Sequence, residues 1–509
     1  MSTSRTDNAI RNVKTALIGQ GFNIVLNFVC RTIFIYTLGK TYLGVSGLFS
    51  NILSIMSLAE LGIGDAIVYK MYKPVAEKDY EQIKSYMQFY KKAYWIIGSF
   101  IFCVGLLLTP FLEYLINGTT QIENLQIIYV LYLVNTSSTY FFAYKRLIIN
   151  TDQKGYIDTI NRYVFLTIQN VLQIIALLLF KNYILYLSIQ ILLNLLANIS
   201  IAHKVNKMYP YLRGEAKSLE KKNLQEIFKQ TVALVIHKIG GVCVSGTDNL
   251  LLSAFVGINW VGIYSNYVTI LSIPQTLLAY IFSPMTASVG NLVATSDQDH
   301  RYKTFKKMFF INFWLYGFCA ICLYVLFNSF IGQVWLDESF VLSKAIVFFI
   351  VLNFYLNGMR QVISAFKSTS GLFWNDRFRP LAEAVVNLVA SVILLKIWGF
   401  IGVLIGTTIS CVCTTVWVEA LIVYKHVFNK GVINFYITYA KYFLSVCLIG
   451  TITNYVCNRI VVTGIGSFII QAIICVLLSN LGFLLLYFNT NEFKQLWKQM
   501  VDRLLKRRL

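Results

Sequence analysis

Hydrophobic positions run along this chain in long, nearly uninterrupted blocks. A helix needs about 20 apolar residues to cross a bilayer, and about fourteen blocks have that length. Because the blocks are continuous, they indicate helices and not the alternating strands of an outer-membrane barrel. The pattern predicts an all-α, polytopic membrane protein with membrane segments at 15–38, 42–70, 93–116, 124–144, 158–180, 182–203, 230–256, 260–286, 308–332, 344–366, 379–398, 399–424, 436–458 and 466–488.

The charged residues are few and unevenly placed. Of the 509 residues, 13% are charged, against about 25% in soluble proteins. Basic residues gather in the loops on the N-terminal side of the predicted helices, and the opposite side carries little beyond Lys40, Lys181, Lys396 and Arg459. Because basic loops stay inside, both termini are expected in the cytoplasm. The same asymmetry explains the net charge of +21 without a nucleic-acid partner.

Two short stretches of the chain resemble each other. TLGKTYLG is similar to FVGINWVG at an offset of 218 residues, so that Gly39 and Gly44 match Gly257 and Gly262. An even number of predicted helices separates the two copies, which therefore have the same orientation in the membrane. Parallel repeats of this kind are found in transporters.

The repeat predicts two lobes and an appendage. The N-terminal lobe, 1–215, contains helices one to six, and the C-terminal lobe, 216–430, contains helices seven to twelve. Residues 431–509 add two helices and a basic amphipathic tail. The tail is expected to lie on the inner leaflet, and the segment 75–92 is expected to do the same.

The first predicted helix carries a polar stripe. Gln20, Asn23, Asn27 and Arg31 fall within about 80° of one another at 100° per residue. A charge at mid-membrane costs roughly 3 kcal/mol on insertion scales. The stripe should therefore face protein or water and not lipid.

Other ionisable residues lie inside predicted helices seven, ten and two. Lys238 and Asp248 share a face of the seventh, Arg360 lies in the tenth, and Glu60 lies in the second. With Arg31, the basic residues would give a water-filled cavity a cationic lining that suits phosphate. Asp248, with Glu60 as second choice, is the candidate for balancing that charge or for binding a coupling Na⁺ or H⁺.

Several intramembrane polar residues have a simpler structural interpretation. Arg379 and Glu383 are spaced to form an ion pair on one helix. Lys367 and Arg146 are near helix ends, where they can reach water and act as topology signals. No catalytic or metal-binding pattern occurs in the loops, and we expect neither an enzyme nor a bound cofactor.

Three pieces of the chain carry a family resemblance. They are RT-x-F-x-x-x-LG at 31–39, YLG-x-x-GLFSNIL at 42–53 and SLAELGIG-x-AI at 57–67. They resemble the start of the Wzx-type polysaccharide-transport flippases, within the multidrug/oligosaccharidyl-lipid/polysaccharide superfamily. Only Arg31, among the candidate residues above, corresponds to a position that such flippases use, the cationic position of the first helix.

The resemblance implies two six-helix bundles that form a V around a central cavity, plus two extra helices. It implies that undecaprenyl-diphosphate carrying a short oligosaccharide moves from the inner to the outer leaflet of the bacterial plasma membrane by alternating access. A polysaccharide polymerase and chain-length machinery would be the partners, in capsule, O-antigen or exopolysaccharide assembly.

Alternatives remain open from the sequence. A cation-coupled multidrug exporter of the same superfamily would more often show an acidic, aromatic-lined cavity, whereas the inward charges here lean basic. A flippase of the peptidoglycan precursor would also need a cationic cavity. A membrane-embedded polymerase or ligase is disfavoured by the short loops on the outer side.

Overall fold

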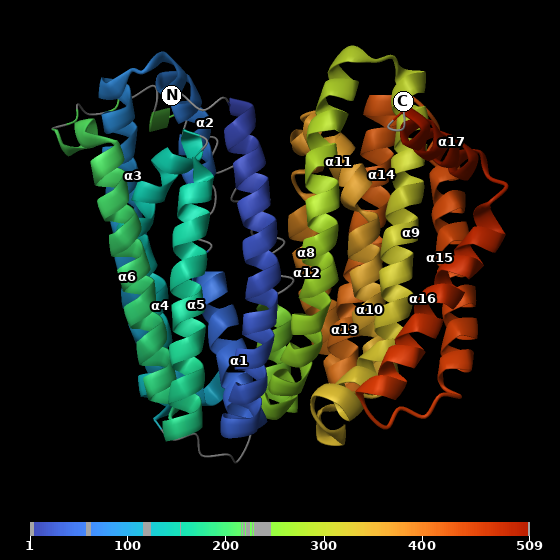
Figure 1. Ribbon diagram of the computed structural model, residues 1–509, viewed down its shortest axis with the longest axis horizontal. Helices are drawn as coiled ribbons and strands as arrows, with labels where there is room; N and C mark the ends of the chain where they lie inside the picture. Colours follow the sequence, from blue (N-terminus) through green and yellow to red (C-terminus); the bar gives the residue numbers. More distant parts are fainter. Residues whose placement is uncertain are drawn as a thin grey trace. The chain divides into compact units, whose positions relative to one another are not determined.

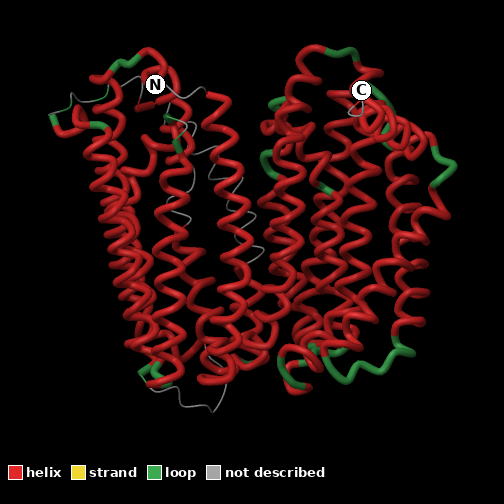
Figure 2. Tube along the Cα trace, in the orientation of Figure 1, coloured by secondary structure: helices red, strands yellow, loops and turns green. Residues whose placement is uncertain are grey.

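The computed structural model of the protein describes residues 5–57, 63–115, 124–152, 154–214 and 246–506, with isolated positions between 215 and 245. Helices account for almost all of these residues and none is in a β-strand, which confirms the all-α prediction (Figures 1 and 2). Internal packing divides the chain into two units, Met1–Gly262 and Ile263–Leu509. The lobe boundary predicted at 215–216 stays a prediction.

The first unit is a bundle of long helices. Within it α1 packs along α5, α5 on α6, α6 on α4, and α4 on α3. Its helices are α1 (Arg5–Met56), α2 (Ile63–Glu77), α3 (Tyr80–Leu108), α4 (Leu125–Thr151), α5 (Gly155–Phe180) and α6 (Tyr183–Met208), with short turns η2 (Thr109–Leu115), η3 (Pro210–Arg213) and η4 (Leu252–Val256).

The second unit is also helical and is interrupted by several tight or wide turns. Helix α9 packs against α10, α15 and α16, and α12 packs against α13. Its elements are α8 (Ile258–Thr295, beginning in the first unit), α9 (Gln298–Phe330), η5 (Ile331–Trp335), η6 (Glu338–Phe340), α10 (Lys344–Met359), α11 (Gln361–Thr369), η7 (Leu372–Asp376), α12 (Arg379–Trp398), α13 (Phe400–Ser410), η8 (Cys411–Val416), α14 (Trp417–Val423), η9 (Tyr424–Phe428), α15 (Ile433–Cys457), α16 (Ile465–Tyr487) and α17 (Asn491–Lys506).

Ten described helices are long and apolar enough to cross a membrane. The first of them, Gly19–Met56, contains most of the first predicted segment and part of the second. Helices α4 and α8 occupy two further predicted segments, and most of the segment 230–256 lies outside the described residues. The membrane-helix architecture is confirmed, and the total of fourteen segments stays a prediction.

The segment 75–92 was predicted to lie on the membrane surface, and that prediction is wrong. The chain turns at Lys78, which has a φ of 58°, and Asp79 caps a new helix by accepting a hydrogen bond from the backbone N–H of Gln82. Tyr80–Leu108 is one continuous helix. Residues 80–92 are therefore the polar first turns of a membrane helix, because a capped, uninterrupted helix carries them directly into the apolar part.

Two matched glycines bend the chain at equivalent places. Gly39 interrupts α1 with a φ of 81°, and Gly257 separates η4 from α8 with a φ of 120°. These positive φ values are accessible to glycine at little cost and are rare for other residues. The two positions are partners at the 218-residue offset of the predicted repeat, so the resemblance between the two stretches includes a shared backbone turn.

The two turns pack on each other inside the first unit in a reciprocal way. A Cβ on Gly44 would lie 2.1 Å from the carbonyl oxygen of Ile258, and a Cβ on Gly262 would lie 2.2 Å from that of Lys40. Thr41 donates a hydrogen bond to the side-chain oxygen of Asn259 at 2.9 Å. A shift of 218 residues converts the Gly44–Ile258 contact into the Gly262–Lys40 contact, and Thr41 and Asn259 are themselves 218 residues apart. The turns are thus related by a local twofold, and only glycine allows the backbones this close approach.

We expect Gly44→Ala and Gly262→Ala each to destabilise the protein. The added methyl group would overlap backbone atoms that cannot rotate away, and overpacking of this kind costs about 1–3 kcal/mol. The midpoint of thermal unfolding in detergent measures the loss. Gly21→Ala is the matched control, because a Cβ there meets nothing within 4 Å. An unchanged midpoint for Gly44→Ala would contradict the close backbone contact.

Candidate functional site

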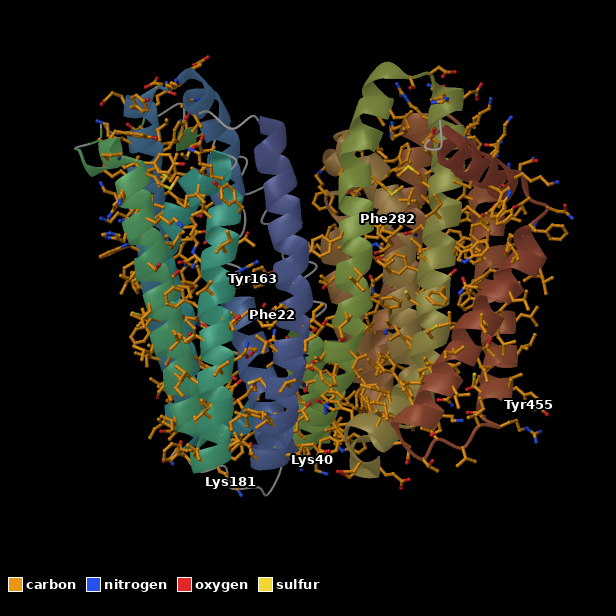
Figure 3. All side chains as sticks on the ribbon, viewed as in Figure 1. Phe22, Lys40, Tyr163, Lys181, Phe282 and Tyr455 are labelled. Atoms are coloured by element: carbon orange, nitrogen blue, oxygen red, sulfur yellow. The ribbon has the colours of Figure 1, made fainter. Side chains whose placement is uncertain are left out.

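The polar stripe of α1 lies against α5. The hydroxyl of Tyr163 donates a hydrogen bond to the side-chain oxygen of Gln20 at 3.0 Å. One turn along α1, the amide of Asn27 donates to Asn23 at 3.0 Å, and the amide of Asn170 on α5 is 3.5 Å from the Asn27 oxygen. Figure 3 shows Tyr163 beside the α1 segment that carries Phe22. The amides of Gln20, Asn23 and Asn27 thus follow one another along α1, which we call the amide ladder. Arg31 lies one turn further, toward Gly39.

The half-buried Arg31 lies near tyrosine side chains of other helices. Its guanidinium interacts electrostatically with Tyr132 and Tyr186, which are on α4 and α6. Tyr132 donates to the hydroxyl of Ser46 at 2.7 Å and shares a 2.9 Å hydrogen bond with the hydroxyl of Tyr183. These hydroxyl groups give the guanidinium polar neighbours. The arrangement suits a cation that meets an anionic ligand.

The phenolic cluster around Arg31 was not predicted from the sequence. Phe34, one turn after Arg31, meets the rings of Tyr183 and Tyr186 edge-on, each with centroids 5.3 Å apart. The available signal was the pair of tyrosines three residues apart at the start of α6, which share one helical face. Their distance from α1 in the sequence hid the contact.

Of the three remaining predicted residues of the first unit, the structure describes only Asp248. Lys238 and Glu60 lie outside the described residues, and their assignments stay predictions. Asp248 is buried, with 7% of its surface exposed, on the helical turn 246–251. A Cβ on the neighbouring Gly246 would lie 2.9 Å from the side chain of Ile55, which places this turn against the second half of α1.

Arg360 lies in the second unit and has carboxylate partners there. It occupies the junction between α10 and α11, where its Nε is 3.3 Å from Glu419 and its Nη1 is 3.7 Å from Glu383. Its guanidinium also donates to the side chain of Asn357 at 3.4 Å. Whether Arg360 contacts substrate stays a prediction, but its charge is balanced in this structure by groups that the sequence analysis did not assign to it.

Arg360 is one member of a compact ion cluster. Lys367 is 2.5 Å from Asp376 and 2.7 Å from Glu419. Arg379 reaches the same two carboxylates at 3.1 and 3.3 Å. Its 2.7 Å contact with Glu383 confirms the predicted pair. Three cations and three carboxylates therefore form a neutral cluster: Arg360, Lys367, Arg379, Asp376, Glu383 and Glu419.

The centre of the cluster is Glu419, which is 2% exposed. It lies on α14, directly after the π-helical turn η8. Thr415, within η8, accepts a hydrogen bond from Arg379 at 2.9 Å. Wide turns of this type are common where a helix must aim a functional side chain. The signal that could have identified Glu419 was a lone carboxylate in an apolar segment.

Lys367 was predicted to reach water, and the structure contradicts this. The residue is 3% exposed, and its ammonium group is bound by two carboxylates. The reason is that the turn η7 folds Asp376 back over the end of α11, which gives the lysine a buried partner nine residues away. Arg146 is also paired, with Asn198 at 2.7 Å and Asp158 at 3.4 Å.

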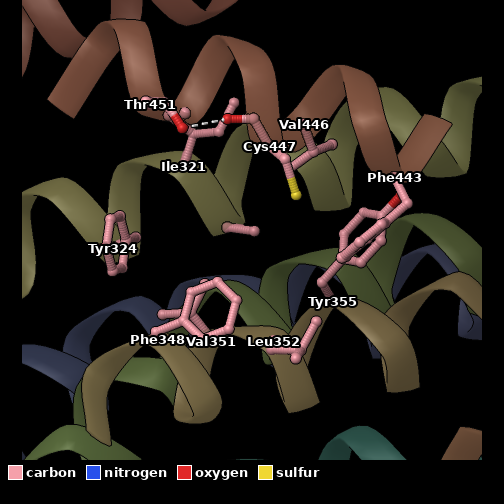
Figure 4. A pocket seen from close by; sticks show the side chains of 12 residues that line it. Ile321, Tyr324, Phe348, Val351, Leu352, Tyr355, Phe443, Val446, Cys447 and Thr451 are labelled. Atoms are coloured by element: carbon pink, nitrogen blue, oxygen red, sulfur yellow. Dashed lines mark hydrogen bonds between the residues drawn. The ribbon is translucent and has the colours of Figure 1, made fainter. Parts of the chain in front are cut away.

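An apolar pocket of about 160 Å³ lies between α9, α10 and α15 in the second unit. Figure 4 shows aromatic side chains around it, including Tyr324, Phe348 and Phe443, and the hydroxyl of Thr451 is hydrogen-bonded to its own helix at Cys447. The described lining offers no charged side chain. This pocket suits a hydrocarbon group and not a charged headgroup.

Comparisons with known proteins agree with this architecture. Among solved structures, Lipid II flippase MurJ in an inward closed conformation matches with a TM-score of 0.66 and 15% identity, over 92% of this chain and 98% of that one. An inward-facing multidrug resistance MATE family transporter matches with a TM-score of 0.56 and 15% identity, over 79% of this chain and 94% of that one. A MOP superfamily transporter from Pyrococcus furiosus matches with a TM-score of 0.55 and 13% identity, over 84% of this chain and 98% of that one. No curated protein matches the sequence significantly.

The fold is shared with these multi-pass membrane proteins, whose descriptions are those of flippases and transporters. The family model described as polysaccharide biosynthesis protein matches residues 9–290, more than half of the chain. The chain belongs to that family.

We expect Glu419→Gln to destabilise the second unit strongly. The substitution removes the carboxylate that Arg360, Lys367 and Arg379 share, and loss of one partner from a buried ion pair costs about 3–5 kcal/mol. The unfolding transition in mixed detergent micelles measures the change. Glu338→Gln is the control, since that exposed side chain makes only a 3.3 Å contact with Gln333. Equal stability of the two variants would show that Glu419 is not the centre of the cluster.

Proposed function

We propose that this protein is a flippase that moves undecaprenyl-diphosphate-linked oligosaccharide repeat units from the cytoplasmic to the outer leaflet of the bacterial plasma membrane. Its product would serve capsule, O-antigen or exopolysaccharide assembly. The polysaccharide biosynthesis family and the fold shared with a lipid flippase support a transported lipid-linked substrate. Both termini would lie in the cytoplasm, as the distribution of basic residues predicts.

The surrounding of Arg31 is the observation that carries this proposal. A cation inside an apolar helix is costly unless hydrogen bonds and an anion compensate it. The neighbours of Arg31 named above supply hydroxyl groups, and the amide ladder of Asn23 and Asn27 continues the polar face along α1. A diphosphate supplies two negative charges and pairs of oxygens that a planar guanidinium can bind through two hydrogen bonds. The amides can bond sugar hydroxyls or phosphate oxygens.

Transport would proceed by alternating access through a central cationic cavity. The sugar-diphosphate headgroup would follow the polar path while the polyprenyl chain stays in lipid. Gln20, Lys238 and Arg360 are the further residues proposed to contact the headgroup. Asp248 or Glu60 would balance charge or bind a coupling Na⁺ or H⁺, and no other cofactor is required.

A peptidoglycan-precursor flippase is the second candidate, and the likeness to Lipid II flippase MurJ favours it. Its substrate would meet the same cationic path, so Arg31 does not distinguish the two functions. The effect of losing the protein on the cell distinguishes them. Loss of a capsule or O-antigen flippase leaves cell-wall synthesis intact, whereas loss of the cell's principal Lipid II flippase stops growth.

We expect Arg31→Ala to lower flipping about 10- to 100-fold, because a hydrogen bond to a charged group contributes about 1.5–3 kcal/mol. Arg31→Lys should retain part of the activity, since it keeps the charge and loses the planar pair of donors. A deletion strain rescued with each variant would be tested for lipid-linked repeat units that an impermeant oxidant can reach from outside.

Arg459→Ala is the matched control, an exposed arginine in the loop that follows α15. It should behave as wild type at equal protein level. Normal oxidant access with Arg31→Ala would contradict the role of Arg31 in the substrate path. Unchanged access in the deletion strain itself would contradict the proposed function, and arrested growth with intact polysaccharide export would favour the peptidoglycan precursor.

A further inference from the structure

We propose that Tyr163 and Asn170 on α5 hold the amide ladder as a row of hydrogen-bond donors, which recognises proton-free oxygen acceptors on the glycan of the substrate. Such acceptors are the carboxylate of an acidic sugar and the carbonyl of an acetamido sugar. This role rests on the proposed function, because the glycan is part of the lipid-linked substrate. The two α5 residues are positioning residues, and the ladder makes the contact.

Tyr163 is fixed against α1 by its ring as well as by its hydroxyl group. A Cβ on Gly19 would lie 2.2 Å from the ring, so only glycine lets the ring lie this close to α1. The guanidinium of Arg162 lies 5.2 Å from the centroid of the same ring. The hydroxyl then donates to the side-chain oxygen of Gln20 at 3.0 Å. A ring held in this way can orient the amide that it contacts.

The phenolic proton determines which way round the Gln20 amide lies. Its acceptor among the described residues is the Gln20 oxygen. With the amide reversed, the NH₂ group would face the hydroxyl and the proton would lose that acceptor, which is costly for a partly buried group. The oxygen of Gln20 is therefore used inside the protein, and its two N–H groups remain for a ligand.

The same polarity continues along α1. The Asn23 oxygen accepts a hydrogen bond from the NH₂ group of Asn27 at 3.0 Å, and the Asn27 oxygen is 3.5 Å from the NH₂ group of Asn170. Asn170 is 3% exposed, whereas Asn27 is exposed. Each oxygen of the ladder thus meets a donor. Within the described part of the chain, the NH₂ groups of Gln20 and Asn23 make no hydrogen bond, so the ladder offers N–H groups to a ligand.

A row of donors favours particular groups on a sugar. A hydroxyl group is a donor as well as an acceptor. If only the ladder bound it, its own proton would have no acceptor, and an unpaired polar group away from water is costly. A carboxylate or carbonyl oxygen has no proton to place. A carboxylate gains further, because hydrogen bonds to an ionised acceptor are stronger than those between neutral groups.

The ladder is placed for the glycan more than for the diphosphate. At a rise of about 1.5 Å per residue, Asn23 and Gln20 lie about 12 and 16 Å from Arg31 along α1. A diphosphate bound at Arg31 is too short to reach them, whereas the sugars joined to it extend further. Phosphate recognition and sugar recognition are therefore separable along one helix.

Transport by the purified protein in liposomes tests the proposal. The probes are three polyprenyl-diphosphate disaccharides whose second sugar is glucuronate, N-acetylglucosamine or glucose. The wild type should move the first two faster than the glucose lipid. Tyr163→Phe keeps the ring and removes the hydroxyl, so it should slow the first two lipids about 2- to 12-fold, the contribution of one hydrogen bond. It should leave the glucose lipid nearly unchanged.

Tyr455→Phe is the matched control, because it also loses one hydrogen bond, the 2.8 Å contact of its exposed side chain with Arg459. It should keep the wild-type preference. Equal wild-type rates for the three lipids, or an equal loss for all three in Tyr163→Phe, would overturn the proposal. A loss confined to the glucuronate lipid would identify the acidic sugar as the recognised group, and one confined to the N-acetylglucosamine lipid would identify the acetamido sugar.

Gln20→Glu tests the polarity of the ladder directly. It keeps an oxygen that accepts from Tyr163 and removes both N–H groups, so transport of the glucuronate and N-acetylglucosamine lipids should fall. Undiminished transport of both would show that Gln20 does not act as a donor and would overturn the proposal. If the wild type moved none of the three lipids, the proposed function itself would be contradicted.

Discussion

A charge inside hydrocarbon must be compensated, and the described parts of this protein depend on two different ways of doing so. In the second unit, three cations are matched by three carboxylates around Glu419. In the first unit, Arg31 is surrounded by phenolic hydroxyls and followed along its helix by amides. The first arrangement is neutral by itself. The second gives a cation on a membrane helix hydroxyl and amide neighbours.

The ion cluster also explains how irregular helices can be stable in the second unit. The chain changes from α10 to α11 at Arg360, turns through η7 at Asp376, and widens at η8 before Glu419. Each of these interruptions weakens a helical hydrogen-bond ladder, and each is next to a member of the cluster. Removing one partner would leave an uncompensated charge as well as an irregular helix, which is why such pairs are costly to break.

Much of the architecture could be predicted from local sequence, because helix length and apolar period are local properties. The stripe from Gln20 to Arg31 follows from the 100° rotation per residue. The turns at Gly39 and Gly257 lie in the gaps between predicted membrane segments. Arg379 and Glu383 are about one helical turn apart, so their ion pair was also predictable.

Contacts between distant segments could not be predicted in this way. Lys367 and Glu419 are 52 residues apart, and no periodicity relates them. The segment 75–92 was misread because its amphipathic pattern is the same for a surface helix and for the polar start of a membrane helix. The uninterrupted helix from Tyr80 to Leu108, which begins at the capping residue Asp79, decides between them. Tyr132 and Tyr186 near Arg31 likewise come from helices that are remote in sequence.

The central claim is that Arg31 recognises a diphosphate as it crosses the membrane. The most direct measurement reconstitutes the purified protein in liposomes and follows the exposure of three polyprenyl-linked oligosaccharides, joined through a diphosphate, a monophosphate or an uncharged ether. The account predicts fastest transfer for the diphosphate and an Arg31→Ala defect that shrinks as the charge of the linkage falls. Equal transfer of all three lipids, with equal loss in the variant, would contradict it.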